Sequence, residues 1–274
     1  MIHVFGDSIA FGHELYDCPH NRIVGDHPKH LVTSSKFSWP ALIGAKNWSN
    51  PGCSNEYIFR CLTILVTKLI KKEPVDKIFI QWTFPERMEL PALWDEEIIS
   101  TTGHWIQGRK DKSIRSIHYW FNLFPTMFSP KNKEEHDYIQ WIDNYYKVIY
   151  TDNLGLIRFL EYIVWCQNLL SNLNIEYYMM LPTKNIIEGL FDKKYSKLKE
   201  SYDTKMAPMG SFYNDDIIHL RESIDWDKFI CYNNEEPFYS ILDRARETGD
   251  IGPEGHPLEE THQEVADELR RRFL

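Results

Sequence analysis

The chain begins with a short apolar run that ends in a glycine and two small polar residues, and this junction limits the folds open to it. Residues 2–5 read Ile-His-Val-Phe, and Gly6, Asp7 and Ser8 follow directly. An apolar run closed by a glycine predicts a buried strand that turns into a helix. Such a turn exposes the side chain at the carboxyl end of the strand, next to the free N–H groups of the helix. Ser8 is therefore a candidate nucleophile, held where backbone amides can receive a developing oxyanion.

Segments of strand type and helix type alternate along the rest of the chain. Further strands are predicted at 47–50, 77–82, 175–182 and 229–231. Helices are predicted at 37–44, 57–71, 154–173 and 259–273. This alternation predicts an α/β fold with a central parallel sheet and helices on both faces. In such sheets the functional residues collect at the carboxyl ends of the strands. Ser8, Gly52 and the turn at 83–85 all fall there.

Residues from about 86 to 153 interrupt the alternation. The region is rich in Trp and Tyr and is longer than an ordinary connection between a strand and a helix. We expect it to be an insertion with its own helices, within one domain that spans residues 1–274. Its aromatic side chains are expected to form the core of the insertion, and a platform for sugars is the alternative.

Composition restricts the partners and the compartment. The net charge of −9 argues against a general surface for nucleic acid or for an anionic membrane. No apolar stretch approaches the roughly 20 residues that span a bilayer, and no signal peptide opens the sequence, so we expect a cytoplasmic protein. A viral protein released by lysis would have the same features. The five cysteines are scattered, and the histidines at 20, 27 and 30 stand in a loop without a metal-binding motif, so we predict no metal site.

Three blocks, taken in chain order, resemble the SGNH/GDSL hydrolases. These are Gly6-Asp7-Ser8 after the first strand, Gly52 after the second, and His256 within Gly-His-Pro before the final helix. The resemblance implies a flavodoxin-like three-layer sandwich and a serine hydrolase that needs no cofactor. It also implies that Ser8 is the nucleophile, that His256 is the general base, and that the N–H groups of Ser8 and Gly52 are oxyanion donors.

The chain departs from the family pattern at two points. The third block of the family carries an Asn that donates to the oxyanion, whereas residues 81–87 here read Gln-Trp-Thr-Phe-Pro-Glu-Arg. We expect Thr83 to replace this donor, and Arg87 to hold an anionic group of the substrate. The family's acid stands three residues before the His, where this chain has Pro253. We predict that Glu254 is the acid, with Asp250 as the alternative.

Each of these residues also has a purely structural interpretation. Asp7 and Ser8 are both favoured as helix N-caps, Gly52 follows a proline as turn glycines do, and Arg87 stands in a cluster of charged residues. Taken together, the blocks favour an esterase that cleaves a small acyl ester, such as an O-acetyl group on a glycan. Two alternatives stay open: a binding or structural module with weakened catalysis, and an O-acyltransferase.

Overall fold

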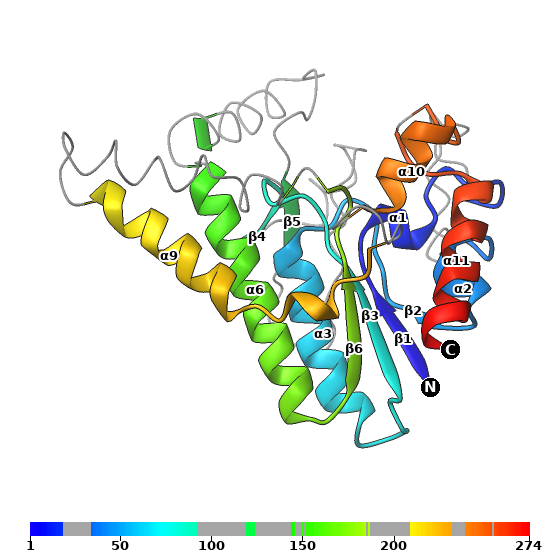
Figure 1. The fold of residues 1–274 in the computed structure, drawn as a ribbon, viewed down its shortest axis with the longest axis horizontal. Helices are drawn as coiled ribbons and strands as arrows, with labels where there is room; N and C mark the ends of the chain where they lie inside the picture. The colour runs from blue at the N-terminus through cyan, green and yellow to red at the C-terminus, as the bar shows by residue number, and fades with distance from the viewer. Residues whose placement is uncertain are drawn as a thin grey trace.

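The fold is built around a four-stranded parallel sheet with helices on both faces, as the alternation of segments predicts (Figure 1). The strand order is β2-β1-β3-β6, and the sheet forms the middle layer of a flavodoxin-like three-layer sandwich. A computed structural model describes residues 1–18, 34–92, 119–123, 144–145, 150, 152–184, 186, 209–231, 239–253 and 255–274.

The bounds of the elements follow the chain. The strands are β1 (Ile2–Phe5), β2 (Lys46–Asn47), β3 (Lys77–Gln81), β4 (Met88–Ala92), β5 (Tyr119–Leu123) and β6 (Glu176–Met180). The helices are α1 (Ser8–Phe11), α2 (Trp39–Leu42), α3 (Asn55–Leu69), α6 (Asp152–Asn172), α9 (Met209–Ser223), the 3-10 turn η3 (Trp226–Lys228), α10 (Ile241–Thr248) and α11 (Glu259–Phe273).

Alternate residues of the central strands enter two separate cores. In β3, Ile78 and Ile80 pack with α3 and α6, whereas Phe79 packs with α2 and α11 on the other face. In β1, Phe5 enters the first core and Val4 the second. Successive side chains of a strand point to opposite faces of the sheet, and helices cover both faces here. The central strands are therefore apolar at nearly every position.

Several elements differ from the sequence prediction. The described part of the region at 86–153 includes an antiparallel pair, β4 with β5, where we expected helices; most of that region lies outside the described residues. The expected strand at 229–231 is reduced to a single parallel bridge between Met179 and Phe229. Helices α9 and α10 were not predicted, because their segments are mostly polar.

The topology brings three turns to one edge of the sheet. The chain passes from β1 to β2 on one side, and then to β3 on the other side of β1. The turns after β1, β2 and β3 therefore meet beside the point where the strand order reverses, which is where ligands bind in open α/β sheets.

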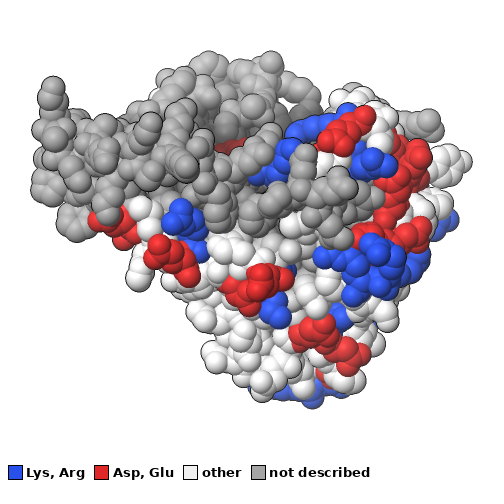
Figure 2. Space-filling model, in the orientation of Figure 1, with Lys and Arg blue, Asp and Glu red and all other residues white. Residues whose placement is uncertain are grey.

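Charged side chains of both signs are mixed on the described surface. In Figure 2, Lys and Arg stand among Asp and Glu rather than in a single broad patch. Among the described residues no helix has the length and apolar character needed to span a membrane.

One buried histidine joins the last helix to the rest of the fold. His262 of α11 is fully buried, and its Nδ1 accepts a hydrogen bond of 3.1 Å from the backbone N–H of Trp39 at the start of α2. Burial and the neighbouring His256 lower the pKa of His262 to about 3 from an ordinary 6.5. The residue is therefore neutral in the folded protein at neutral pH.

This lowered pKa predicts a specific loss of stability in mild acid. Between pH 6.5 and pH 3 the unfolded chain takes up a proton at His262 and the folded chain does not. The free energy of unfolding should fall with decreasing pH by up to about 1.4 kcal/mol per pH unit from this residue alone. Chemical denaturation from pH 7 to pH 4.5 measures the slope. His262→Gln should reduce the change of the unfolding free energy with pH. His219→Gln is the control and should leave that change as it is, because His219 is exposed.

Candidate active site

Ser8 lies at the first position of a very short helix directly after β1. Asp7 is the N-cap of α1, and its Oδ1 accepts a hydrogen bond of 3.0 Å from the N–H of Ile9. Gly6 is required just before it, because a Cβ there would stand 2.8 Å from the Cβ of Ala10 and 2.9 Å from that of Gln81. The N-cap interpretation is thus correct for Asp7, and it leaves the Ser8 hydroxyl available for another partner.

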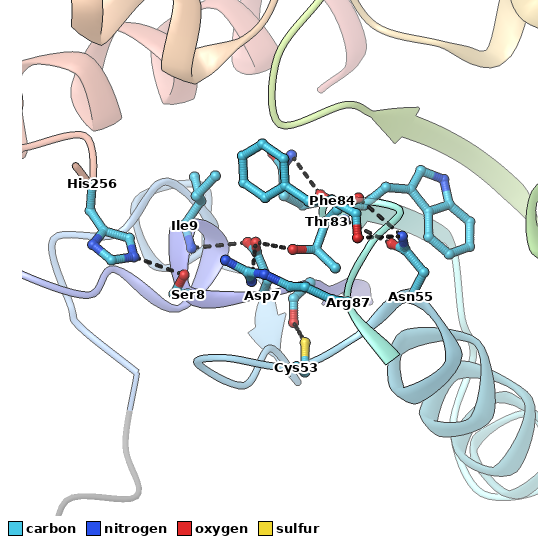
Figure 3. A network of polar contacts seen from close by, with 12 residues as sticks. Asp7, Ser8, Ile9, Cys53, Asn55, Thr83, Phe84, Arg87 and His256 are labelled. Atoms are coloured by element: carbon cyan, nitrogen blue, oxygen red, sulfur yellow. Dashed lines mark hydrogen bonds and ion pairs between the residues drawn. The ribbon is translucent and has the colours of Figure 1, made fainter. Parts of the chain in front are cut away.

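The partner of Ser8 is His256, from the opposite end of the chain. The Nε2 of His256 lies 2.9 Å from the Oγ of Ser8, as the labelled side chains in Figure 3 show. The Nδ1 of the same ring lies 3.0 Å from the Oε2 of Glu14, and the backbone N–H of His256 donates to that oxygen at 3.1 Å. Ser8, His256 and Glu14 therefore form a continuous hydrogen-bonded series of hydroxyl, imidazole and carboxylate.

Glu14 reaches the ring because α1 ends after one turn. Gly12 closes the helix with a left-handed φ of +82°, and Glu14 itself has a φ of +69°, which is uncommon for a residue with a side chain. Its carboxylate is nearly buried, with 4% of the side chain exposed. Gly252 makes room for it, since a Cβ at that position would lie 2.6 Å from the Glu14 Oε2. Glycine is therefore needed at 252 by the space that Glu14 occupies.

The acid predicted from the sequence, Glu254, lies outside the described residues and stays a prediction. The alternative, Asp250, accepts a hydrogen bond of 2.6 Å from the N–H of Thr261 and thereby holds the start of α11. The carboxylate that contacts the Nδ1 of His256 belongs to Glu14. A signal was present: a carboxylate six residues after the nucleophile, just beyond a glycine that stops the helix.

The N–H groups of Ser8 and Gly52 are the two oxyanion donors that the sequence predicts. Gly52 follows Pro51 in a turn closed by the Cys53 N–H on the Asn50 carbonyl at 3.4 Å, and its φ of +69° explains the glycine. The Asn50 N–H donates to the Gly6 carbonyl at 3.0 Å, which joins this turn to the segment that carries Ser8. Within the described part of the chain, neither the N–H of Ser8 nor that of Gly52 has a hydrogen-bond acceptor.

Thr83 and Arg87 both contact Asp7. The Thr83 hydroxyl donates to the Oδ2 of Asp7 at 2.7 Å, a contact that the sequence did not predict. Its role as an oxyanion donor stays a prediction. The Nη1 of Arg87 lies 3.4 Å from the same oxygen (Figure 3). Asp7 is completely buried, and these contacts supply the partners that a buried carboxylate needs.

Asn55 is a residue that the sequence did not single out. Its Oδ1 accepts from the Thr83 N–H at 2.8 Å, and its Nδ2 donates to the carbonyls of Thr83 and Phe84 at 3.0 and 3.3 Å. The side chain thus fixes the turn after β3 to the first residue of α3. The only sequence signal for it was an Asn at a helix start.

A second histidine packs on His256. The ring of His13 meets that of His256 edge to face, with 4.7 Å between the centroids and 79° between the planes. His13 is buried, so it limits the directions in which the His256 ring can rotate.

The described residues contain no group of three or more His, Cys, Asp or Glu side chains that could hold a metal ion. The histidines at 20, 27 and 30 lie outside them. Comparison with protein-family models and with curated proteins finds no match to this chain.

The first prediction from this site concerns the acid. Glu14→Gln should lower kcat on a short-chain ester by about 10²–10⁴-fold, because a neutral amide neither fixes the tautomer of His256 nor stabilises its charged form. Steady-state kinetics with a chromogenic ester measure it. Asp250→Asn and Glu254→Gln are the controls and should keep kcat within a few fold. Gly252→Ala should resemble Glu14→Gln, because its methyl group occupies the space of the carboxylate.

The second prediction concerns the buried carboxylate of Asp7. Thr83→Val keeps the shape of the side chain and removes the hydroxyl that donates to Asp7. The free energy of unfolding should fall by about 1–3 kcal/mol, since a buried acceptor loses a partner. Urea denaturation measures the free energy of unfolding. Thr83→Ser is the control, because it keeps the hydroxyl. An unchanged free energy in Thr83→Val would contradict a structural role for this hydrogen bond.

Proposed function

We propose that this protein is a serine esterase of the SGNH/GDSL type. The observation that carries the proposal is the series of contacts from the Ser8 Oγ to His256 at 2.9 Å and from His256 to Glu14 at 3.0 Å. The turn at Gly52 and the parallel sheet with Ser8 after its first strand support it. All three side chains have low exposure: Ser8 is buried, Glu14 is 4% exposed and the His256 side chain 17%.

The chemistry follows from which atom holds each proton. With Glu14 accepting from Nδ1–H, the Nε2 of His256 is unprotonated and accepts the Ser8 proton as Oγ attacks the ester carbonyl. The carbonyl electrons move to oxygen, and the amides of Ser8 and Gly52 donate to that oxyanion. Collapse of the tetrahedral intermediate expels the alcohol, which takes the proton from His256 and leaves an acyl-serine.

Deacylation repeats these steps with water. His256 removes a proton from water, the hydroxide attacks the acyl-serine, and the Ser8 oxygen leaves with the proton of the imidazolium. The acid is released and Ser8 is restored. The substrate class that we propose is a small acyl ester, such as an O-acetyl group on a glycan.

This function predicts selective labelling of one serine. A fluorophosphonate probe should modify Ser8, because only an activated hydroxyl attacks it at a useful rate. Mass spectrometry of the labelled peptide identifies the site. Ser8→Ala should abolish labelling and lower turnover of a short-chain ester by at least about 10³-fold, with an unchanged midpoint of thermal unfolding.

Ser54→Ala is a matched control, since Ser54 is another buried serine, at the N-cap of α3. That variant should still be labelled at Ser8. A folded wild-type protein that neither labels nor turns over any short ester would indicate a binding module instead of an enzyme.

A further inference from the structure

A shallow hollow, open to solvent, lies next to the candidate active site and is not used by the steps above. It is bounded by the start of α3, the turn after β3 and the first half of α6. Its polar lining includes two arginines, two tyrosines, an asparagine and a glutamate: Arg87, Arg158, Tyr150, Tyr162, Asn55 and Glu56. Arg87 belongs to both places, because it lines the hollow and also contacts Asp7, the neighbour of Ser8 (Figure 3).

The two arginines of this hollow differ in their ion pairs. The Arg87 guanidinium is paired with Asp7 at 3.4 Å and lies over the Phe84 ring at 5.3 Å. Arg158 is exposed, and among the described residues it has neither an ion-pair nor a hydrogen-bond partner. Glu56 is the acidic side chain of the lining, so an incoming anion is favoured on the Arg158 side.

Aromatic rings continue from the hollow along the same face of α6. Arg158, Tyr162 and Trp165 follow at spacings of four and three residues, which puts them on one stripe about 10 Å long. Tyr162 stacks on Phe59 of α3, with 5.3 Å between the centroids and 26° between the planes. Trp165 contacts both rings and is 51% exposed.

Gly155 makes room for the ring of Tyr150, the other tyrosine that lines the hollow. A Cβ at Gly155 would lie 2.1 Å from the Tyr150 hydroxyl, so the phenol is seated directly against the backbone of α6. The hollow thus combines a guanidinium that has no ion pair among the described residues, phenol rings and an amide. A guanidinium pairs with a carboxylate in a fixed geometry, and an aromatic face packs against the apolar face of a sugar ring.

We propose that this hollow binds the carboxylate of an acidic sugar, with Arg158 as its main charged contact. The alcohol part of the ester cleaved at Ser8 is then an acidic carbohydrate. This second statement rests on the proposed esterase function, whereas the binding itself does not require a reaction.

Binding is tested on the full chain with Ser8→Ala, which cannot turn over a ligand. Calorimetric titration compares an oligogalacturonate with a neutral galacto-oligosaccharide of the same length at low salt. We expect the acidic saccharide to bind at least about tenfold more tightly, with an affinity that falls as ionic strength rises. Equal affinity for the two saccharides, or no binding of either, would overturn the proposal.

Substitutions locate the site. Arg158→Gln should weaken binding of the oligogalacturonate about tenfold, which is the ratio expected for one charge-assisted contact. Arg246→Gln is the matched control: Arg246 is exposed on α10, is likewise without an ion pair among the described residues, and does not line the hollow. If both variants bind equally well, the hollow is not the site. Inorganic sulfate that competes fully would indicate a general anion site without recognition of the sugar ring.

Activity measurements distinguish the proposal that the hollow binds an acidic sugar from the proposal that this sugar is part of the ester substrate. For the wild-type protein, kcat/KM on an O-acetylated oligogalacturonate should exceed kcat/KM on the acetylated neutral saccharide. The Arg158→Gln substitution should remove most of that difference. Failure of fluorophosphonate labelling would refute the esterase and leave the binding result standing. Labelling of Ser8 together with equal rates on the two acetylated saccharides would refute the assignment of the acidic substrate and leave the esterase standing.

Discussion

The candidate active site depends on the burial of one carboxylate, that of Asp7. A carboxylate without any exposure costs several kcal/mol unless donors surround it, and here the donors come from three places: the N–H of Ile9, the hydroxyl of Thr83 and the guanidinium of Arg87. These contacts join the turn after β1 to the turn after β3. Ser8 is the next residue after Asp7, so its position is set by how well those donors are placed.

The two halves of the site come from opposite ends of the chain. Ser8 and Glu14 belong to the first turn after β1, whereas His256 is carried by the loop that precedes α11. A bridge between Ile251 and Pro257 closes this loop, and the Asp250 carboxylate holds the N–H of Thr261. Docking of α11 through His262 and Trp39 therefore brings His256 to Ser8 and Glu14, which are already together. Loss of this docking at low pH is therefore expected to disturb the site through the fold.

The sequence predicted the features that depend on local signals. The Gly-Asp-Ser junction, the two long apolar helices and the Gly-His-Pro block have short-range patterns, and the structure confirms the sheet and brings Ser8 to His256. Glu14 was missed because its role depends on a left-handed backbone that no apolar period reveals. The contact of Thr83 with Asp7 was not predicted, because the sequence does not show that Asp7 is buried and needs a donor. Helix α10 had a usable signal, since Ser240 and Asp243 form a capping box that the polar composition obscured.

The length of α1 decides whether the site can form at all. In an uninterrupted α-helix, residues 8 and 14 would be separated by about 9 Å along the axis, and six steps of 100° would turn them to different faces. Glu14 could not then reach a ring that is hydrogen-bonded to Ser8. Gly12 stops the helix after four residues, with its N–H on the carbonyls of Ser8 and Ile9, and the chain folds back beneath His256. A residue with a Cβ at position 12 would be strained at φ +82° and would also lie 2.7 Å from the Cβ atoms of Ser35 and Ser38. The acid of this site is therefore specified by a glycine two residues before it as much as by the carboxylate itself.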